Sequence, residues 1–76
     1  MNNTRRKKLA GIIKSLESAQ ELLEELRDEE QEYLDNMPES LQGFDKYSIG
    51  EEAVDNMDSA IDSINEVIDY VESARA

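Results

Sequence analysis

The feature that most constrains the fold of this chain is a heptad repeat of apolar residues. In the first half, apolar side chains recur at alternating intervals of three and four residues, as along the contact seam of a coiled coil. These positions are Leu9, Ile12, Leu16, Ala19, Leu23, Leu26, Tyr33 and Met37, and Glu30 is the one interruption; Ile13, Leu22 and Leu34 widen the stripe. The stretch has no proline and is rich in strong helix formers. We therefore expect a helix over residues 5–36, capped by Asn3 or Thr4.

The second half carries the same kind of repeat. Its seam positions are Ala53, Met57, Ala60, Ile64, Val67, Val71 and Ala74, with Val54, Ile61 and Ile68 in the adjoining positions. Ser48 followed three residues later by Glu51 has the form of a capping box, which marks the start of a helix. The sequence thus predicts a second helix over residues 48–75.

The connector, residues 37–47, interrupts the apolar repeat. Pro38 cannot sit inside a helix, and Gly43 can take the positive φ that ends one. Asn36 can cap a single turn over residues 38–42. Because Leu41, Phe44 and Tyr47 are spaced by three, two interpretations are open. The connector either folds back as an apolar lid over the end of the helices or presents a partner-binding tip.

Two helices of similar length joined by a short connector predict an all-α antiparallel hairpin, which forms one domain over residues 1–76. Leu16 should then lie near Ile68, and Leu23 near Ile61. The apolar stripes are wider than a two-helix seam requires, so we expect dimerisation into a four-helix bundle. The residues expected to serve self-association are Leu9, Ile12, Ile13, Leu16, Leu23, Leu26, Met57, Ile61, Ile64, Ile68 and Val71.

Charge is distributed unevenly along the chain. The 19 acidic and 8 basic residues give a formal net charge of -11. Residues 1–14 carry Arg5, Arg6, Lys7, Lys8 and Lys14 and no acid, so every carboxylate lies downstream, opposed only by Arg27, Lys46 and Arg75. Such a body repels phosphate backbones and anionic membranes and attracts basic surfaces. We expect a protein partner with a basic surface, and neither direct nucleic-acid binding nor membrane binding.

Carboxylates form a continuous ridge on the second helix, opposite its apolar stripe. Asp55, Asp58, Asp62, Glu66, Asp69 and Glu72 are separated by three or four residues, and no lysine balances them between Glu51 and Ala76. A second acidic block consists of Glu24, Glu25, Asp28, Glu29 and Glu32. The ridge is either a solvated outer face or a partner-binding surface whose charge density is of the order of that of DNA.

Several kinds of chemistry are excluded by composition or geometry. The chain has no cysteine and no histidine, which rules out disulfides and the usual zinc sites. No segment matches a calcium-binding loop, and a two-helix hairpin has no pocket that would separate the pKa values of paired carboxylates. We expect no enzymatic activity, catalytic residue, cofactor or metal. Neither a signal peptide nor a transmembrane stretch is evident, so we expect a cytoplasmic protein.

The basic segment Arg5–Lys8 has three interpretations. It can neutralise Asp69 and Glu72 at the far end of the second helix, it can contact nucleic acid, or it can be a solvated helix start. Positive charge at a helix N-terminus opposes the helix dipole, so the position is mildly unfavourable by itself.

A resemblance adds a biological setting. At "DNMPESLQ" (35–42), followed by "AVDNMDSAIDSINEVIDYVESA" (53–74), the chain resembles a group of short acidic helical proteins encoded in phages and prophages of Gram-positive bacteria. The resemblance implies no catalytic residues. It implies action in the host cytoplasm by binding a host protein, as DNA-mimicking inhibitors of restriction, CRISPR and other defence systems do.

The leading hypothesis is therefore a non-enzymatic acidic interaction protein that inhibits a host defence or nucleic-acid-binding protein through its carboxylate-rich face. One alternative is a structural or regulatory bundle that self-associates through its apolar flank. Another is a sponge that binds a signalling nucleotide between protomers, for which only Arg5–Lys8 and Lys14 could hold the phosphates.

Overall fold

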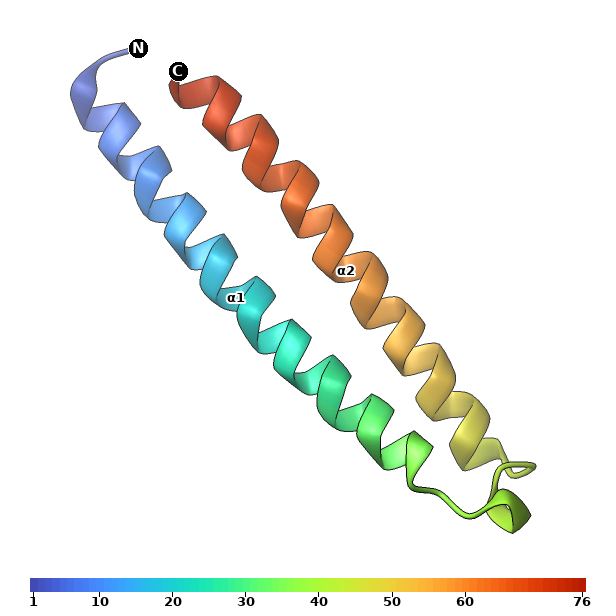
Figure 1. Ribbon diagram of the computed structural model, residues 1–76. Coiled ribbons are helices and arrows are strands. Elements are labelled where there is room, and N and C mark those ends of the chain that lie inside the picture. The colour runs from blue at the N-terminus through green and yellow to red at the C-terminus, as the bar shows by residue number, and fades with distance from the viewer.

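The computed structural model describes all 76 residues as two long antiparallel helices and a short connector (Figure 1). Helix α1 spans Asn3–Asp35, a 3-10 turn η1 spans Glu39–Leu41, and helix α2 spans Asp45–Arg75. Both termini lie at one end of the molecule and the connector lies at the other (Figure 1). The expected all-α hairpin is confirmed.

The helix ends differ from the predicted ones in their capping. At α1 the cap is Asn2, whose side-chain oxygen accepts a hydrogen bond of 2.8 Å from the backbone N–H of Arg5. Helix α2 follows Phe44, which provides no side-chain cap. Ser48 therefore lies inside the helix, and the predicted capping box is wrong. The acidic Asp45 stands in the first turn instead, where negative charge favours the helix dipole.

The connector turns without a glycine in the left-handed region. No residue has positive φ, so the role predicted for Gly43 is also wrong. The single turn η1 forms after Pro38, as expected, and the Gln42 side chain donates a 3.2 Å hydrogen bond to the carbonyl of Met37. This bond ties the end of the turn back to the end of α1.

The contact seam between the helices is rotated from the predicted one. On α1, the stripe of buried and half-buried residues runs through Arg6, Leu9, Ile13, Leu16, Gln20, Leu23, Arg27, Glu30 and Leu34, and half-buried Met37 follows just beyond the helix end. On α2 they run through Tyr47, Gly50, Val54, Met57, Ile61, Ile64, Ile68, Val71 and Arg75. The predicted seam residues Ile12, Ala19, Leu26, Tyr33, Val67 and Ala74 are exposed instead. Their assignment to the seam is wrong.

The rotation has a physical reason in the polar residues that it brings into the seam. Gln20 donates from its side chain to the carbonyl of Ile61 at 3.1 Å and to the Asn65 side chain at 2.9 Å. Arg27 donates to Asp58 at 2.9 Å. Polar groups that are withdrawn from water are tolerated when they are hydrogen-bonded, and these two half-buried side chains both have partners. The contacts also agree with the expected register, which places Leu23 level with Ile61.

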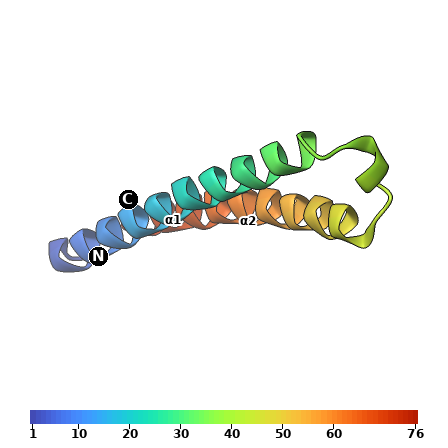
Figure 2. The same ribbon diagram turned by 90° about the horizontal axis from the view of Figure 1, so that it is seen from below.

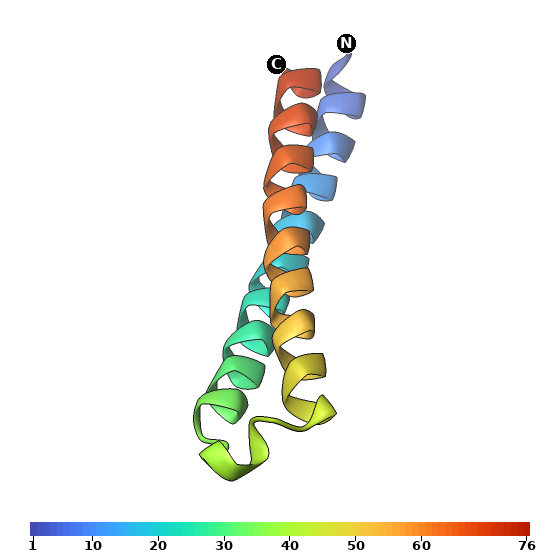
Figure 3. The ribbon, with the colours of Figure 1, turned by 90° about the vertical axis from the view of Figure 1, so that its right-hand side faces the viewer.

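The two helices wind around each other over their whole length. In Figure 3, α1 lies to the right of α2 near the termini and to its left near the connector. Figure 2 shows the gentle curvature of the pair. A seam that repeats every seven residues requires this winding, because an untwisted helix has 3.6 residues per turn.

The core of the hairpin is thin. Only Ile13, Leu34, Val54 and Ile61 are buried apolar residues, and Leu34 is the most completely enclosed at 1% exposure. The molecule is correspondingly elongated, measuring 60 × 15 × 12 Å. Two helices alone do not enclose more than a single row of side chains.

Side chains of α1 lie directly against the backbone of α2 at Gly50, which is itself buried. A Cβ atom there would lie 2.6 Å from Cδ2 of Leu34 and 2.8 Å from Oε1 of Glu30. Leu34 is enclosed and has little room to move. The absence of a side chain at Gly50 therefore allows Leu34 to fill the seam at the connector end.

We expect the two glycines inside helices to respond oppositely to alanine. Gly11→Ala meets nothing within 4 Å, so it should raise the free energy of unfolding by about 0.5–1 kcal/mol through helix propensity. Gly50→Ala gains the same propensity but overpacks against Leu34 at a cost of about 1–3 kcal/mol, so it should lower stability. Urea unfolding followed by circular dichroism measures both. Equal stabilisation by the two changes would contradict the close approach at Gly50.

Candidate functional site

The rotated seam sorts the remaining side chains onto two opposite sides of the hairpin. Asp58 and Asn65, seven residues apart, contact Arg27 and Gln20 across one side of the seam. On the other side, Nζ of Lys46 lies 5.4 Å from the centre of the Tyr33 ring. Residues that repeat these positions at intervals of seven share the same side. One side is acidic, and the other is largely apolar.

The acidic face combines carboxylates from both helices. Each member directly follows a seam residue in the sequence, as Asp55 follows Val54 and Asp58 follows Met57. On α1 they are Glu17, Glu21, Glu24, Asp28 and Asp35; on α2 they are Glu51, Asp55, Asp58, Asp62, Asp69 and Glu72. Lys7 and Lys14 share this side of α1 only near the termini. The face is therefore most acidic from the middle of the hairpin to the connector.

Few of these carboxylates are neutralised. Arg27 pairs with Asp28 at 3.1 Å and with Asp58 at 2.9 Å, and Arg75 pairs with Glu72 at 3.0 Å. Both arginines lie in the seam, so they reach the face from its inner edge. The hydrogen bond to Asp58 and then that to Asp28 raise the pKa of Arg27 above its usual value. The other carboxylates of the face form no ion pair and present their charge to solvent.

The structure places most, but not all, of the predicted partner-binding acids on this face. It brings together Asp55, Asp58, Asp62, Asp69, Glu72, Glu24 and Asp28. Glu25, Glu32 and Glu66 lie on the outer sides of their helices, and Glu29 lies on the side of the apolar residues. Glu17, Glu21, Asp35 and Glu51 belong to the face and were missed. Intervals of three, four or seven residues link them to Glu24, Asp28 and Asp55, and these intervals were the available signal.

The apolar face lies on the opposite side. It contains Ile12, Ala19, Leu22, Leu26 and Tyr33 of α1, and Ile49, Ala53, Ala60, Val67, Tyr70 and Ala74 of α2. The larger of these side chains are 43–76% exposed. Of the residues expected to serve self-association, only Ile12 and Leu26 lie here. The others, Leu9, Ile13, Leu16, Leu23, Met57, Ile61, Ile64, Ile68 and Val71, lie in the seam.

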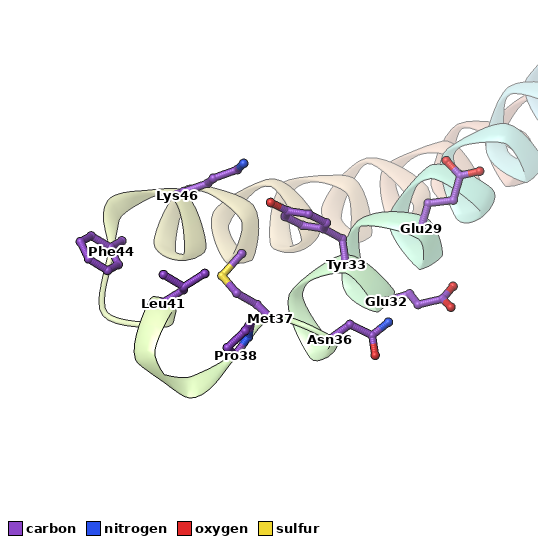
Figure 4. A pocket seen from close by; sticks show the side chains of 9 residues that line it. All are labelled: Glu29, Glu32, Tyr33, Asn36, Met37, Pro38, Leu41, Phe44 and Lys46. Atoms are coloured by element: carbon purple, nitrogen blue, oxygen red, sulfur yellow. The ribbon is translucent and has the colours of Figure 1, made fainter.

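A surface pocket of 750 Å³ opens where α1 meets the connector. Figure 4 shows Leu41 and Phe44 at its connector end and Glu29 and Glu32 beyond Tyr33 at its other end; Asn36, Met37, Pro38 and Lys46 complete the lining. Leu41 and Phe44 are 46% and 60% exposed. They line an open pocket, so the expected apolar lid over the end of the helices does not form.

Tyr33 stands where the apolar face meets this pocket. Nζ of Lys46 lies 5.4 Å from the centre of the Tyr33 ring. At this distance an ammonium ion is attracted to an aromatic face. The Tyr33 hydroxyl is the main cause of a raised pKa of Lys46, and the charge of Glu30 adds to it. Lys46 provides the one positive charge among the residues that line the pocket.

The basic N-terminal segment has no partner within the hairpin. Arg6 donates to the side chain of Asn3 at 3.3 Å, but none of Arg5–Lys8 forms an ion pair. Glu72, which was expected to face this segment, pairs with Arg75. Intramolecular neutralisation of the far end of α2 is thus not observed. Arg5, Lys7 and Lys8 are exposed, and Arg6 is half-buried.

No group of three or more acidic side chains lies close enough to hold a metal ion. Neither helix contains an apolar stretch of the length needed to cross a membrane. Comparison with protein families, with curated proteins and with solved structures found no match. The surfaces of the hairpin themselves must therefore support any functional conclusion.

We expect the acidic face to cost the isolated hairpin stability. Asp62 lies four residues from both Asp58 and Glu66, and like charges at this spacing each destabilise a helix by about 0.2–0.5 kcal/mol. Asp62→Asn should raise the free energy of unfolding by about 0.5 kcal/mol at low salt, because the two residue types have similar helix propensity. In about 1 M NaCl, where the screening length is about 3 Å, the gain should vanish. A gain independent of salt would contradict the electrostatic explanation.

Proposed function

We propose that this protein is a non-enzymatic interaction protein that binds a basic surface of another protein through its acidic face. The observation that carries the proposal is the separation of charge produced by the rotated seam. Carboxylates of both helices share one side of a narrow rod, and few of them are paired. A surface of this kind offers a row of negative charge comparable with a nucleic-acid backbone.

The class of partner follows from that chemistry. Surfaces that bind nucleic acid are rich in lysine and arginine, and their long-range field accelerates association with an acidic protein. We propose a DNA-binding or defence protein of a bacterial host as the target. The resemblance to small acidic phage and prophage proteins supports this setting.

The apolar face supports a second component of the proposal, which is pairing of two hairpins into a four-helix bundle. Exposed apolar side chains in a contiguous patch mark interaction surfaces. The hairpin exposes 5727 Å², whereas a compact monomer of 8.7 kDa exposes about 4,700 Å². The excess, about 1,000 Å², is of the size that each partner contributes to a standard interface, about 800 Å². In such a bundle both acidic faces point outward.

The acidic face is tested by removing its charge without changing its shape. Asp55→Asn, Asp62→Asn and Asp69→Asn together should abolish retention of basic DNA-binding proteins from a Gram-positive bacterial lysate that the parent chain retains. Duplex DNA should displace those proteins from the parent chain, and salt should weaken their binding steeply. Quantitative mass spectrometry of the retained proteins measures both effects.

A matched variant separates the face from overall charge. Glu39→Gln, Asp45→Asn and Glu52→Gln remove the same number of charges from exposed positions outside the face. This variant should retain the same proteins as the parent chain. Equal loss of retention in both variants would show that only the net charge of the chain matters. Unchanged retention in the Asp55, Asp62 and Asp69 variant would overturn the proposal.

Self-association is tested at the middle of the apolar face. Leu26→Glu should raise the dimer dissociation constant about 100-fold or more, because it places a charge in an apolar contact. Ser18→Glu adds the same charge on the outer side of α1 and should leave the dimer intact. Sedimentation velocity over a dilution series measures both. A monomeric parent chain at micromolar concentration would rule out the dimer while leaving the acidic-face proposal in place.

A further inference from the structure

The ends of the apolar face on α1 carry opposite charges. Arg5 precedes Ile12 by seven residues, and therefore shares the helix position of Ile12, Ala19, Leu26 and Tyr33. Lys8, Leu22 and Glu29 are likewise related by multiples of seven. The face thus runs from two cations near the termini, through apolar side chains, to a carboxylate beside the connector.

Neither charged end is satisfied within the hairpin. Arg5 and Lys8 form no ion pair, and neither does Glu29 or its neighbour Glu32. The two acids flank the pocket that Leu41 and Phe44 line at the connector end. Because the hairpin is 60 Å long, the positive and negative ends of one molecule cannot reach each other. A second copy in the reverse orientation brings them together.

We propose that two hairpins pair through their apolar faces with their connectors at opposite ends, so that α1 of each lies antiparallel to α1 of the other across a two-fold axis at Ala19. This inference rests on the self-association component of the proposed function and specifies its geometry. Ile12 and Leu26 each lie seven residues from Ala19, so each packs against the partner's copy of the other. The small side chain of Ala19 lies at the crossing, where the two helices come closest.

The same geometry accounts for the basic segment. Lys8 comes within one residue of the level of the partner's Glu29, and Arg5 comes within one residue of the level of the partner's Glu32 beside the pocket. The two-fold axis repeats both pairs, so the contact is self-complementary, as an isologous interface requires. With the connectors at the same end, two acidic connector regions would instead lie side by side. Charge therefore selects the opposite-end arrangement.

The orientation can be measured with dyes, because the natural chain has no cysteine. Thr4→Cys and Ser40→Cys place single thiols at exposed sites near the termini and in the connector. In a mixture of donor-labelled Ser40→Cys and acceptor-labelled Thr4→Cys protomers, energy transfer should be efficient. Between two Ser40→Cys protomers it should be much weaker, because the sites lie almost a molecular length apart.

The outcomes distinguish the proposed orientation from the proposed dimer on which it rests. Efficient transfer between two Ser40→Cys protomers, and little transfer to Thr4→Cys, would overturn the orientation while leaving the dimer in place. No transfer in any mixture, together with a monomeric mass by sedimentation, would overturn both. An excess of unlabelled protein must abolish the energy transfer in each mixture. This control shows that the transfer arises from exchange of protomers between dimers.

A charge exchange tests the end contacts themselves. Lys8→Glu should weaken the dimer about 5-fold, and adding Glu29→Lys should restore it. Adding Glu52→Lys instead gives the same net charge but lies on the outer side of α2, and it should not restore the dimer. Equal rescue by the two second changes would show that Lys8 acts only through net charge and would overturn the contact.

Discussion

The packing of this protein depends on which of two neighbouring apolar stripes each helix turns toward the other. On α1 both stripes repeat every seven residues, and they share Leu16 and Leu23. One stripe adds Ile12 and Leu26, and the other adds Ile13 and Leu34. The second stripe fills the seam, and it brings Gln20 and Arg27 with it. Those two side chains find hydrogen-bond partners in Asn65, Asp58 and the carbonyl of Ile61. Hydrogen-bond partners of this kind offset the cost of placing polar groups in the seam.

That choice determines what the surface presents. A turn of each helix by about one residue leaves Ile12 and Leu26 exposed on one side, and it moves the carboxylates of both helices toward the other side. Were Ile12 and Leu26 in the seam, the acids of α2 would form an outer ridge, separate from those of α1. Instead, Asp58 lies within 2.9 Å of Arg27, and the acids of the two helices flank a common seam. Packing and electrostatics are thus two consequences of one rotation.

The sequence was sufficient to predict the helices, their antiparallel order and their register, because these depend on periodicity, Pro38 and chain length. It was not sufficient to predict the rotation. A stripe that contains Ala19 and Leu26 is more apolar than one that contains Gln20 and Arg27, so hydrophobicity alone favoured the wrong seam. The deciding contacts join residues that lie 31 to 45 positions apart. The need for glycine at position 50 also depends on a tertiary contact, because Leu34 occupies the space that a side chain there would fill. The acidic face was therefore predicted only in part, because Glu25, Glu29, Glu32 and Glu66 lie off it.

The two proposed interfaces place opposite demands on ionic conditions. Each protomer carries a formal charge of -11, so bringing two together is opposed by repulsion that salt screens, while the apolar contact is little affected. Binding of a basic partner depends on the same charge and weakens as salt rises. The contacts of Arg5 and Lys8 with a second copy would reduce the repulsion at the ends of the bundle without neutralising the acidic faces. The placement of the basic residues near the termini, away from the middle of the acidic face, reconciles self-association with a surface that stays strongly negative.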